Sequence, residues 1–177
     1  MSRVTVHFIK LHPEVPDPAW GTVFANCFDL HFFSTTMAVQ GYSAGSEPFH
    51  REVHGNTLRI MPGDRVLVPT GLIFRLEDHL NGPTCNLSIR LHPRSGLAYK
   101  KGLTLANCEG IVDIDYNQQT YVLMTNIGTT PQVIRRGDRI CQAEVCVNEK
   151  IKLVKSDLRN FVSLETDRSG GFGSTGE

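Results

Sequence analysis

The clearest structural pattern in the sequence is the run Cys141-Gln142-Ala143-Glu144-Val145-Cys146-Val147, in which apolar side chains alternate with more polar ones. A period of two sends successive side chains to opposite faces of a β-strand. The run therefore predicts a half-buried strand whose Cys141 face lies toward a core. Alternation of the same kind recurs at 4–8 and at 87–91, so the sequence favours a protein built mainly from strands.

Turn-forming residues separate the apolar runs. The 177 residues include 16 Gly and 9 Pro, with turn signals at 62–64, 69–71, 81–83 and 136–138. Many short strands with such punctuation predict a sandwich, barrel or jelly roll. Helix is expected only in two short pieces. One lies over 95–101, with Ser95 as its cap and Gly102 just past its end, and the other is a single turn within 152–160.

Length and charge limit the functions that this chain can have. A chain of 177 residues fits one domain. Its 18 Lys and Arg balance 18 Asp and Glu, which argues against broad electrostatic binding of nucleic acid or membrane. No run approaches the roughly 20 apolar residues of a membrane span, and the N-terminus lacks the features of a signal peptide.

The 5 Cys residues are odd in number and form no C-x-x-C pair, so we expect neither a disulfide framework nor a zinc site. Free thiols are typical of a reducing compartment. We therefore expect the protein in the cytoplasm: the host cytoplasm if the source is a virus, with the nucleus as a further compartment in a eukaryotic host.

Two segments do not fit the strand pattern. Residues 35–56 are rich in Gly, Ser and His and are expected to form a long loop, a feature that is usually functional or mobile. Residues 168–177 cannot pack a core, because Phe172 is their single apolar side chain. This tail is either a plain disordered end or a flexible arm with an aromatic ring to stack and donors for phosphate.

Two places near strand ends could hold ligands. Asp29 lies between apolar residues and is either a strand-edge acid or an anchor for a metal or a metal-bound water. In Arg94-Ser95-Gly96, a strand is expected to give way to a helix. Free backbone N–H groups and the fork of arginine donors suit an anion there, although an ordinary capped helix explains the same residues.

Two further places carry polar side chains next to predicted strands. Asp113 and Asp115 alternate along one arm of an expected hairpin, which puts both on one face. Like charges there repel each other unless a cation, a water or a substrate lies between them; the alternative is a solvated pair. In 136–142, a turn enters a strand, and Gln142 is the residue expected to face a site.

Taken in order, these segments resemble the five motifs of the trimeric deoxyuridine triphosphatase (dUTPase) family. One such motif alone would be a weak signal, but five in order along one chain are specific. The linking run at 60–72 also resembles the family, whereas 35–56 is additional. The matching segments are CFDL at 27–30, PRSGLA at 93–98, GIVDIDY at 110–116, RGDRICQ at 136–142 and GGFGSTG at 170–176.

The resemblance implies an all-β distorted jelly roll, also called a β-clip, that assembles as a homotrimer. Residues 1–160 would form the β-domain with 35–56 inserted, and 161–177 a flexible arm that closes over an active site. The implied reaction is hydrolysis of dUTP to dUMP and pyrophosphate with Mg²⁺. This reaction limits uracil in DNA and supplies dUMP for thymidylate synthesis.

The resemblance also implies roles for individual residues. Asp113 would activate the water that attacks the α-phosphorus, with Gln142 and Ser95 as further catalytic residues. Asp29 would reach Mg²⁺ through waters, the metal being held mainly by substrate phosphates. The implied substrate-binding residues are Arg94, Ser95, Gly96, Asn107, Gly110, Val112, Asp113, Tyr116, Gln142, Arg168, Phe172, Gly173, Ser174 and Thr175.

Within this set, Asn107 and the backbone up to Val112 would read uracil, Tyr116 would pack on the deoxyribose, and Phe172 would stack over the base. The sequence departs from the family pattern in three places. Cys27 replaces a glycine, Asn117-Gln118 follow Tyr116 without the usual glycine, and Arg168 lies one residue closer to Phe172 than usual.

Two alternatives remain. One is a dCTP deaminase, or a bifunctional deaminase and dUTPase, on the same fold. The other is a regulatory binding protein with this fold, whose partner contacts the segment 35–56.

Overall fold

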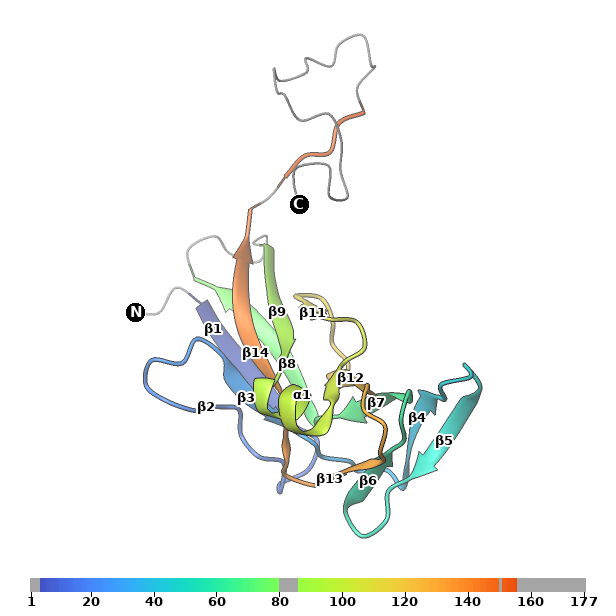
Figure 1. Cartoon of the computed structure of the whole chain (residues 1–177). Coiled ribbons are helices and arrows are strands. Elements are labelled where there is room, and N and C mark those ends of the chain that lie inside the picture. Colours follow the sequence, from blue (N-terminus) through green and yellow to red (C-terminus); the bar gives the residue numbers. More distant parts are fainter. Residues whose placement is uncertain (1–3, 80–85, 150, 156–177) are drawn as a thin grey trace.

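A computed structural model of the chain describes residues 4–79, 86–149 and 151–155 (Figure 1). In this part, every paired strand runs antiparallel to its neighbours, and there is a single helix, α1 (Ser95–Lys101). The expectation of an all-β protein with little helix is confirmed. No helix in these ranges is long and apolar enough to cross a membrane.

Two five-stranded sheets form the body of the molecule. The first has the order β10-β12-β7-β4-β5 and the second the order β11-β9-β14-β3-β2. The first sheet comprises β10 (Leu103–Leu105), β12 (Tyr121–Asn126), β7 (Arg65–Pro69), β4 (Ala38–Tyr42) and β5 (Pro48–Glu52). The second comprises β11 (Gly110–Asp113), β9 (Asn86–Pro93), β14 (Arg139–Asn148), β3 (Phe28–His31) and β2 (Ala19–Trp20).

Two strand pairs complete the fold. One pair is β1 (Val4–Lys10) with β8 (Leu72–Asp78), and the other is β6 (Thr57–Ile60) with β13 (Gln132–Arg135). In Figure 1, β1 and β8 lie close to β14 and β9, while β6 and β13 lie at the opposite end of the molecule.

The two large sheets share one core. The alternating run that begins at Cys141 lies in β14, where Cys141 and Ala143 are buried and Val147 is 47% exposed. The same hydrophobic cluster contains the predicted inward residues of β9 and the inward residues of β7 and β12. These are Leu87, Ile89, Leu91, Val66, Val68, Val122 and Met124. The packed sheets confirm the prediction of a jelly-roll type of fold.

The expectation of a loop over 35–56 is wrong. Strands β4 and β5 form a hairpin there, and β4 also pairs with β7. The inward positions of β4 are Val39 and Gly41, and a Cβ on Gly41 would lie 2.6 Å from the carbonyl oxygen of Arg65 and 2.7 Å from the Phe49 ring. Packing therefore requires a glycine where an alternating pattern would show an apolar side chain.

Three smaller predictions also need correction. The helix begins at Ser95 itself; its N-cap is Arg94, which makes no side-chain capping bond, although Gly102 ends the helix in the left-handed conformation as expected. Lys152–Lys155 are not helical, and 156–160 lie outside the described residues. Strand β11 stops at Asp113, so Asp115 lies in the following turn and not on the same strand.

Candidate active site

Three neighbouring strands bring one group of predicted site residues together. In the register of the second sheet, Gln142 of β14 lies opposite Asp29 of β3 on one side and opposite His92 of β9 on the other. Directly opposed residues share a face of a sheet. The sequence motifs at 27–30, 93–98 and 136–142 thus meet at one end of this sheet.

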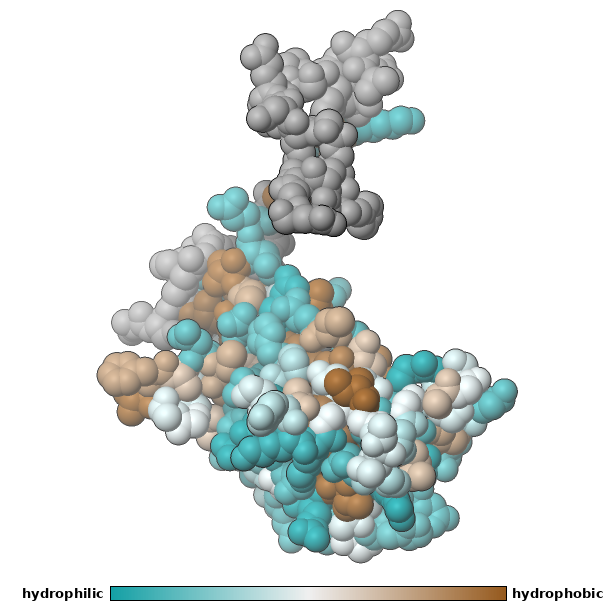
Figure 2. Space-filling model, viewed as in Figure 1, coloured by the Kyte–Doolittle hydropathy of each residue, from teal (hydrophilic) through white to brown (hydrophobic). Residues whose placement is uncertain are grey.

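Asp29 is the buried centre of this group, with 7% of its surface exposed. Arg94 donates from Nε to its Oδ1 at 3.1 Å, and Arg139 donates from Nη1 to its Oδ2 at 3.0 Å. One carboxylate thus holds two guanidinium groups, so the cluster keeps a net positive charge. Ser95 and Gly96 are exposed beside it, and the surface around α1 is largely hydrophilic (Figure 2). We conclude that this end of the sheet can receive an anion.

His31 belongs to this cluster, and sequence reasoning missed it. It lies opposite Arg139, and its Nδ1 is buried without a hydrogen-bond partner among the described residues. Burial lowers the pKa of His31; Asp29 raises it, and Arg139 and Arg94 lower it further. The net direction is downward, which favours a neutral imidazole, so the positive charge of the cluster comes from the two arginines.

A second group of predicted residues lines a pocket of about 310 Å³ at the edge of the molecule formed by β10, β11 and β12. Asn107, Gly110, Val112 and Tyr116 all contribute to its wall. Within the described part of the chain, no hydrogen bond engages the side-chain amide of Asn107. The remaining lining residues are Leu67, Leu91, Leu105, Ile111, Thr120, Tyr121 and Leu123.

The turn after Tyr116 is built without the glycine that the family pattern usually carries. The Tyr116 hydroxyl donates to the carbonyl oxygen of Gln119 at 3.0 Å. Gln119 in turn donates to the Tyr121 hydroxyl at 2.7 Å and accepts from the Gly71 amide at 3.0 Å. Side-chain hydrogen bonds therefore define the shape of this turn.

Asp113, the predicted base, ends β11 in an exposed position opposite Ser88 of β9. Arg94 lies six positions beyond Ser88 along β9 and its end. At about 3.3 Å per residue, this separates Asp113 from the arginine cluster by roughly 20 Å. The chain thus places its predicted site residues in two groups that do not meet: the arginine cluster around Asp29, and the pocket with Asp113.

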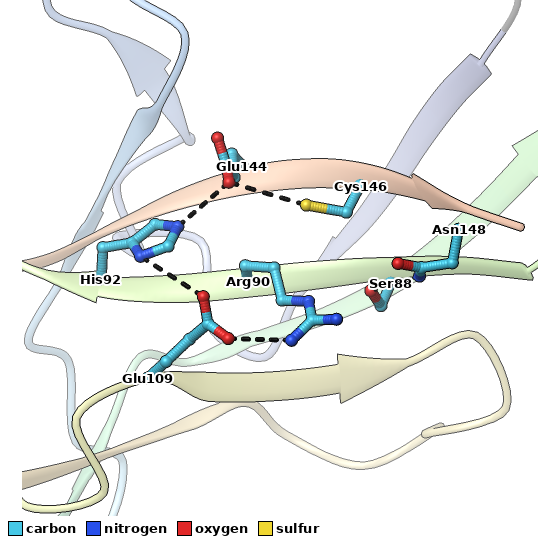
Figure 3. A network of polar contacts seen from close by, with 7 residues as sticks. All are labelled: Ser88, Arg90, His92, Glu109, Glu144, Cys146 and Asn148. Carbon is cyan, nitrogen blue, oxygen red and sulfur yellow. Dashed lines mark hydrogen bonds and ion pairs between the residues drawn. The ribbon is translucent and has the colours of Figure 1, made fainter. Parts of the chain in front are cut away.

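A polar network lies between these two groups on β9, β14 and the loop before β11 (Figure 3). Arg90 donates to Glu109 at 2.8 Å, and the two nitrogens of His92 lie 3.7 Å from Glu109 and 3.2 Å from Glu144. Cys146 lies 3.6 Å from Glu144; burial and that carboxylate raise the pKa of its thiol. The sequence did not reveal this network, because only the strand register brings its members together.

The described residues contain no group of three or more His, Cys, Asp or Glu side chains that could hold a metal. Asp29 is the one predicted metal residue, and each of its oxygens already accepts one arginine bond. A carboxylate can accept about four hydrogen bonds, so Asp29 can still accept bonds from water. The residues therefore suit a metal that is bound through its waters, and they do not form a cage of direct ligands.

The remaining predicted site residues, Arg168, Phe172, Gly173, Ser174 and Thr175, lie outside the described residues. The same holds for the whole of the proposed arm at 161–177, and for Cys85. The other four cysteines are free thiols, as expected.

The fold and the two groups define a β-protein with a pocket and a separate cluster of arginines that can receive an anion. Comparison with known proteins identifies the family: the family model for dUTPase matches residues 54–176. The chain belongs to the dUTPase family.

Relatives and solved structures agree with this assignment. A deoxyuridine 5'-triphosphate nucleotidohydrolase of Heliobacterium modesticaldum is 34% identical over 173 residues, covering 97% of this chain and 96% of that protein. The dUTPase of Staphylococcus bacteriophage 80alpha with dUPNHPP shares the fold with a TM-score of 0.70 at 16% identity, covering 98% of this chain and 99% of that one.

A mutant dUTPase of phage phi11 of S. aureus, whose structure describes the coordination of a structural Mg(II) ion, also shares the fold. Its TM-score is 0.62 at 14% identity, and the match covers 89% of this chain and 99% of that one. At this level of identity, the two phage structures support the fold alone.

Proposed function

We propose that this protein hydrolyses dUTP to dUMP and pyrophosphate. The observation that carries the proposal is the pocket at the β10–β11 loop, lined by Asn107, Gly110, Val112 and Tyr116 in a chain of the dUTPase family. Asn107 and the backbone from this loop to Val112 pair with the edge of uracil. Tyr116 packs on the deoxyribose, where a ring leaves no room for a 2′-hydroxyl.

The phosphate chain lies against the arginine cluster. Arg94, Ser95 and Gly96 bind the phosphates, and Gln142 holds the water or a phosphate oxygen. Phe172 of the arm stacks over uracil, while Arg168, Gly173, Ser174 and Thr175 bind the γ-phosphate end. Charge-assisted bonds from arginine are the strong contacts in such a site.

Asp113 takes a proton from the attacking water, whose oxygen forms the new bond to the α-phosphorus as the bond to the leaving pyrophosphate breaks. A general base of this kind contributes roughly 10²–10⁴-fold to the rate. Mg²⁺ would neutralise the charge of the phosphates in this site. Asp29 would hold the metal through water molecules, since its oxygens can accept further hydrogen bonds.

We propose a homotrimer, because one chain cannot join its two groups. Asp113 and the arginine cluster are separated by roughly 20 Å along β9, which is too far for both to reach one α-phosphate. A site at a subunit boundary can combine the pocket of one chain with the arginine cluster of the next. The arm at 161–177 then closes over the site.

The proposed activity limits uracil in DNA and supplies dUMP for thymidylate synthesis. Free thiols at Cys27, Cys108, Cys141 and Cys146 fit a reducing compartment such as the cytoplasm.

The decisive test is pyrophosphate release from dUTP, dCTP, dTTP and UTP. We expect rapid release with dUTP and weak release with the other three, because the pocket excludes the amino group of cytosine, the 5-methyl of thymine and the 2′-hydroxyl of ribose. Equal rates with dCTP would contradict the specificity. Ammonia release from dCTP would favour the deaminase alternative.

A second role, as a binding module for another protein, is favoured by one observation. Strand β5 forms the outer edge of the first sheet, and edge strands can pair with an added strand. The test is to replace the hairpin at 35–56 with a short turn. Unchanged binding of every protein partner by this variant would exclude the role, whichever result dUTP hydrolysis gives.

A further inference from the structure

The loop 106–109 joins β10, in the first sheet, to β11, in the second, and carries part of the pocket. Its backbone turns sharply: the Cys108 amide donates to Leu105 O at 3.2 Å, and the Glu109 amide donates to Asn107 O at 2.6 Å. Cys108 has a φ of 62°, which is unfavourable for a residue with a side chain. Such a conformation persists where its surroundings hold it.

The side chain of Glu109 fixes the end of this loop to strand β9. Its carboxylate accepts from Arg90 at 2.8 Å and lies 3.7 Å from Nδ1 of His92, so two side chains of β9 fix it (Figure 3). The contacts are partly shielded from water, with 26% of the Arg90 side chain and 30% of that of His92 exposed. Asn107, two residues before Glu109, and Gly110, directly after it, line the pocket.

We propose that Glu109 is a positioning residue for the base pocket: clamped by Arg90 and His92, it holds the loop 106–109 in the shape that binds the nucleotide base. The proposal rests on the proposed function of the pocket. Because the clamp acts on the binding surface and lies away from the reacting phosphate, it controls substrate affinity far more than turnover.

His92 connects this clamp to the neighbouring strand β14. Its two ring nitrogens lie 3.7 Å from Glu109 and 3.2 Å from Glu144. The clamp is therefore supported by side chains of both β9 and β14.

The test compares Glu109→Gln and Arg90→Gln with the wild type. We expect the KM for dUTP to rise about 5- to 10-fold in each variant, the size expected for a partly exposed charged hydrogen bond, with kcat within about 2-fold. The double variant should be no worse than either single one, because both changes break the same contact. Glu77→Gln, which changes an exposed Glu–His pair on β8, is the matched control.

The split between KM and kcat is the readout that a merely structural role would not move. A loss of folded protein lowers the apparent kcat and leaves KM unchanged, whereas a misplaced loop raises KM.

The rate of hydrogen exchange of the amides at 106–110 measures how well the clamp holds the loop when no nucleotide is bound. We expect about 10-fold faster exchange in Glu109→Gln than in the wild type, and unchanged exchange in Glu77→Gln. Unchanged exchange in Glu109→Gln, or a loss of kcat without a rise in KM, would overturn the proposal. Failure of the wild type to hydrolyse dUTP would instead contradict the proposed function and leave this exchange result standing. If Glu109→Gln does not fold, Arg90→Gln gives the same two measurements.

Discussion

Two regions of this protein, the β4–β5 hairpin and the β10–β11 loop between the two sheets, each contain an arginine–carboxylate pair, but the two pairs have different roles. In β4–β5, Arg51 donates to Asp64 and to the Arg59 carbonyl oxygen, and the Asp64 side chain is 4% exposed. In β10–β11, Arg90 holds Glu109, whose side chain is 41% exposed. The buried pair joins the hairpin to the body of the fold, whereas the exposed pair adjusts a loop beside a pocket. Breaking the Arg51–Asp64 pair should therefore lower the free energy of unfolding. Breaking the Arg90–Glu109 pair should lower the affinity for the nucleotide.

The largest effect that we expect lies at the end of β11, the strand that follows the β10–β11 loop. Asp113→Asn removes the proposed base and should lower kcat roughly 10²–10⁴-fold, while the chain still binds the nucleotide. Single-turnover hydrolysis of dUTP and calorimetric titration with a non-hydrolysable analogue measure the two properties separately. Full activity in this variant would contradict the role of Asp113. Asp115→Asn, in the turn after β11, is the control that should keep most of the activity.

The second effect concerns the stability of the β4–β5 hairpin. Arg51→Ala leaves the buried Asp64 carboxylate without its cation, and we expect the free energy of unfolding to fall by about 3 kcal/mol. Arg51 also stacks over the Phe49 ring at 4.3 Å, so packing is lost as well. Urea denaturation measures the loss, and Arg59→Ala, an exposed arginine on the neighbouring strand β6, is the matched control. Equal stability of the two variants would show that the pair does not anchor the hairpin.

A third change tests the packing of the same hairpin without altering charge. Gly41→Ala places a methyl group against Arg65 O and the Phe49 ring, and overpacking of this kind costs about 1–3 kcal/mol. Gly45→Ala, at the tip of the hairpin, meets only the Ser43 hydroxyl at 3.8 Å and should be nearly neutral. Thermal melting of the two variants separates a tightly packed hairpin from a loosely attached one.

The two regions also differ in how well sequence reasoning predicted them. The motif at 110–116 indicated the pocket, because family-specific residue types stand at fixed spacing. The expected hairpin there is wrong, because β11 pairs with β9 and β10 pairs with β12. The segment 35–56 was misjudged because Gly41 occupies an inward position and the inward Arg51 is charged, so no apolar alternation marks β4–β5. A contact that demands a small residue, or a buried ion pair, leaves no periodic signal in the sequence.

The residues of the candidate site also divide into those that the sequence could predict and those that it could not. Asp29, Arg94 and Gln142 could be proposed from their motifs, and the strand register brings them together. The polar network could not be proposed, since Arg90, Glu109 and Glu144 are distant along the chain. Each is an ordinary surface residue until β9, β11 and β14 align.

The smallest effect uses cysteine chemistry to compare the β10–β11 loop with the core. Burial, and to a lesser extent Asp29, raise the pKa of Cys141, and burial also raises the pKa of Cys27. A raised pKa leaves less thiolate at a given pH, so both should react slowly with iodoacetamide at pH 7.5 and faster only as the pH rises. Cys108 is exposed in the β10–β11 loop and should react first among the four described cysteines.

Because Cys108 adjoins Asn107, a dUTP analogue bound in the pocket should slow its alkylation by about 3-fold or more, by the mass action of a ligand that binds the closed loop. Peptide mass spectrometry with and without the analogue measures this protection, and the rates at Cys27 and Cys141 provide the internal control. Protection at all three sites would indicate a general stabilisation of the fold. Protection confined to Cys108 would place the nucleotide at the β10–β11 loop, because Cys108 is the one of these three cysteines that lies in that loop.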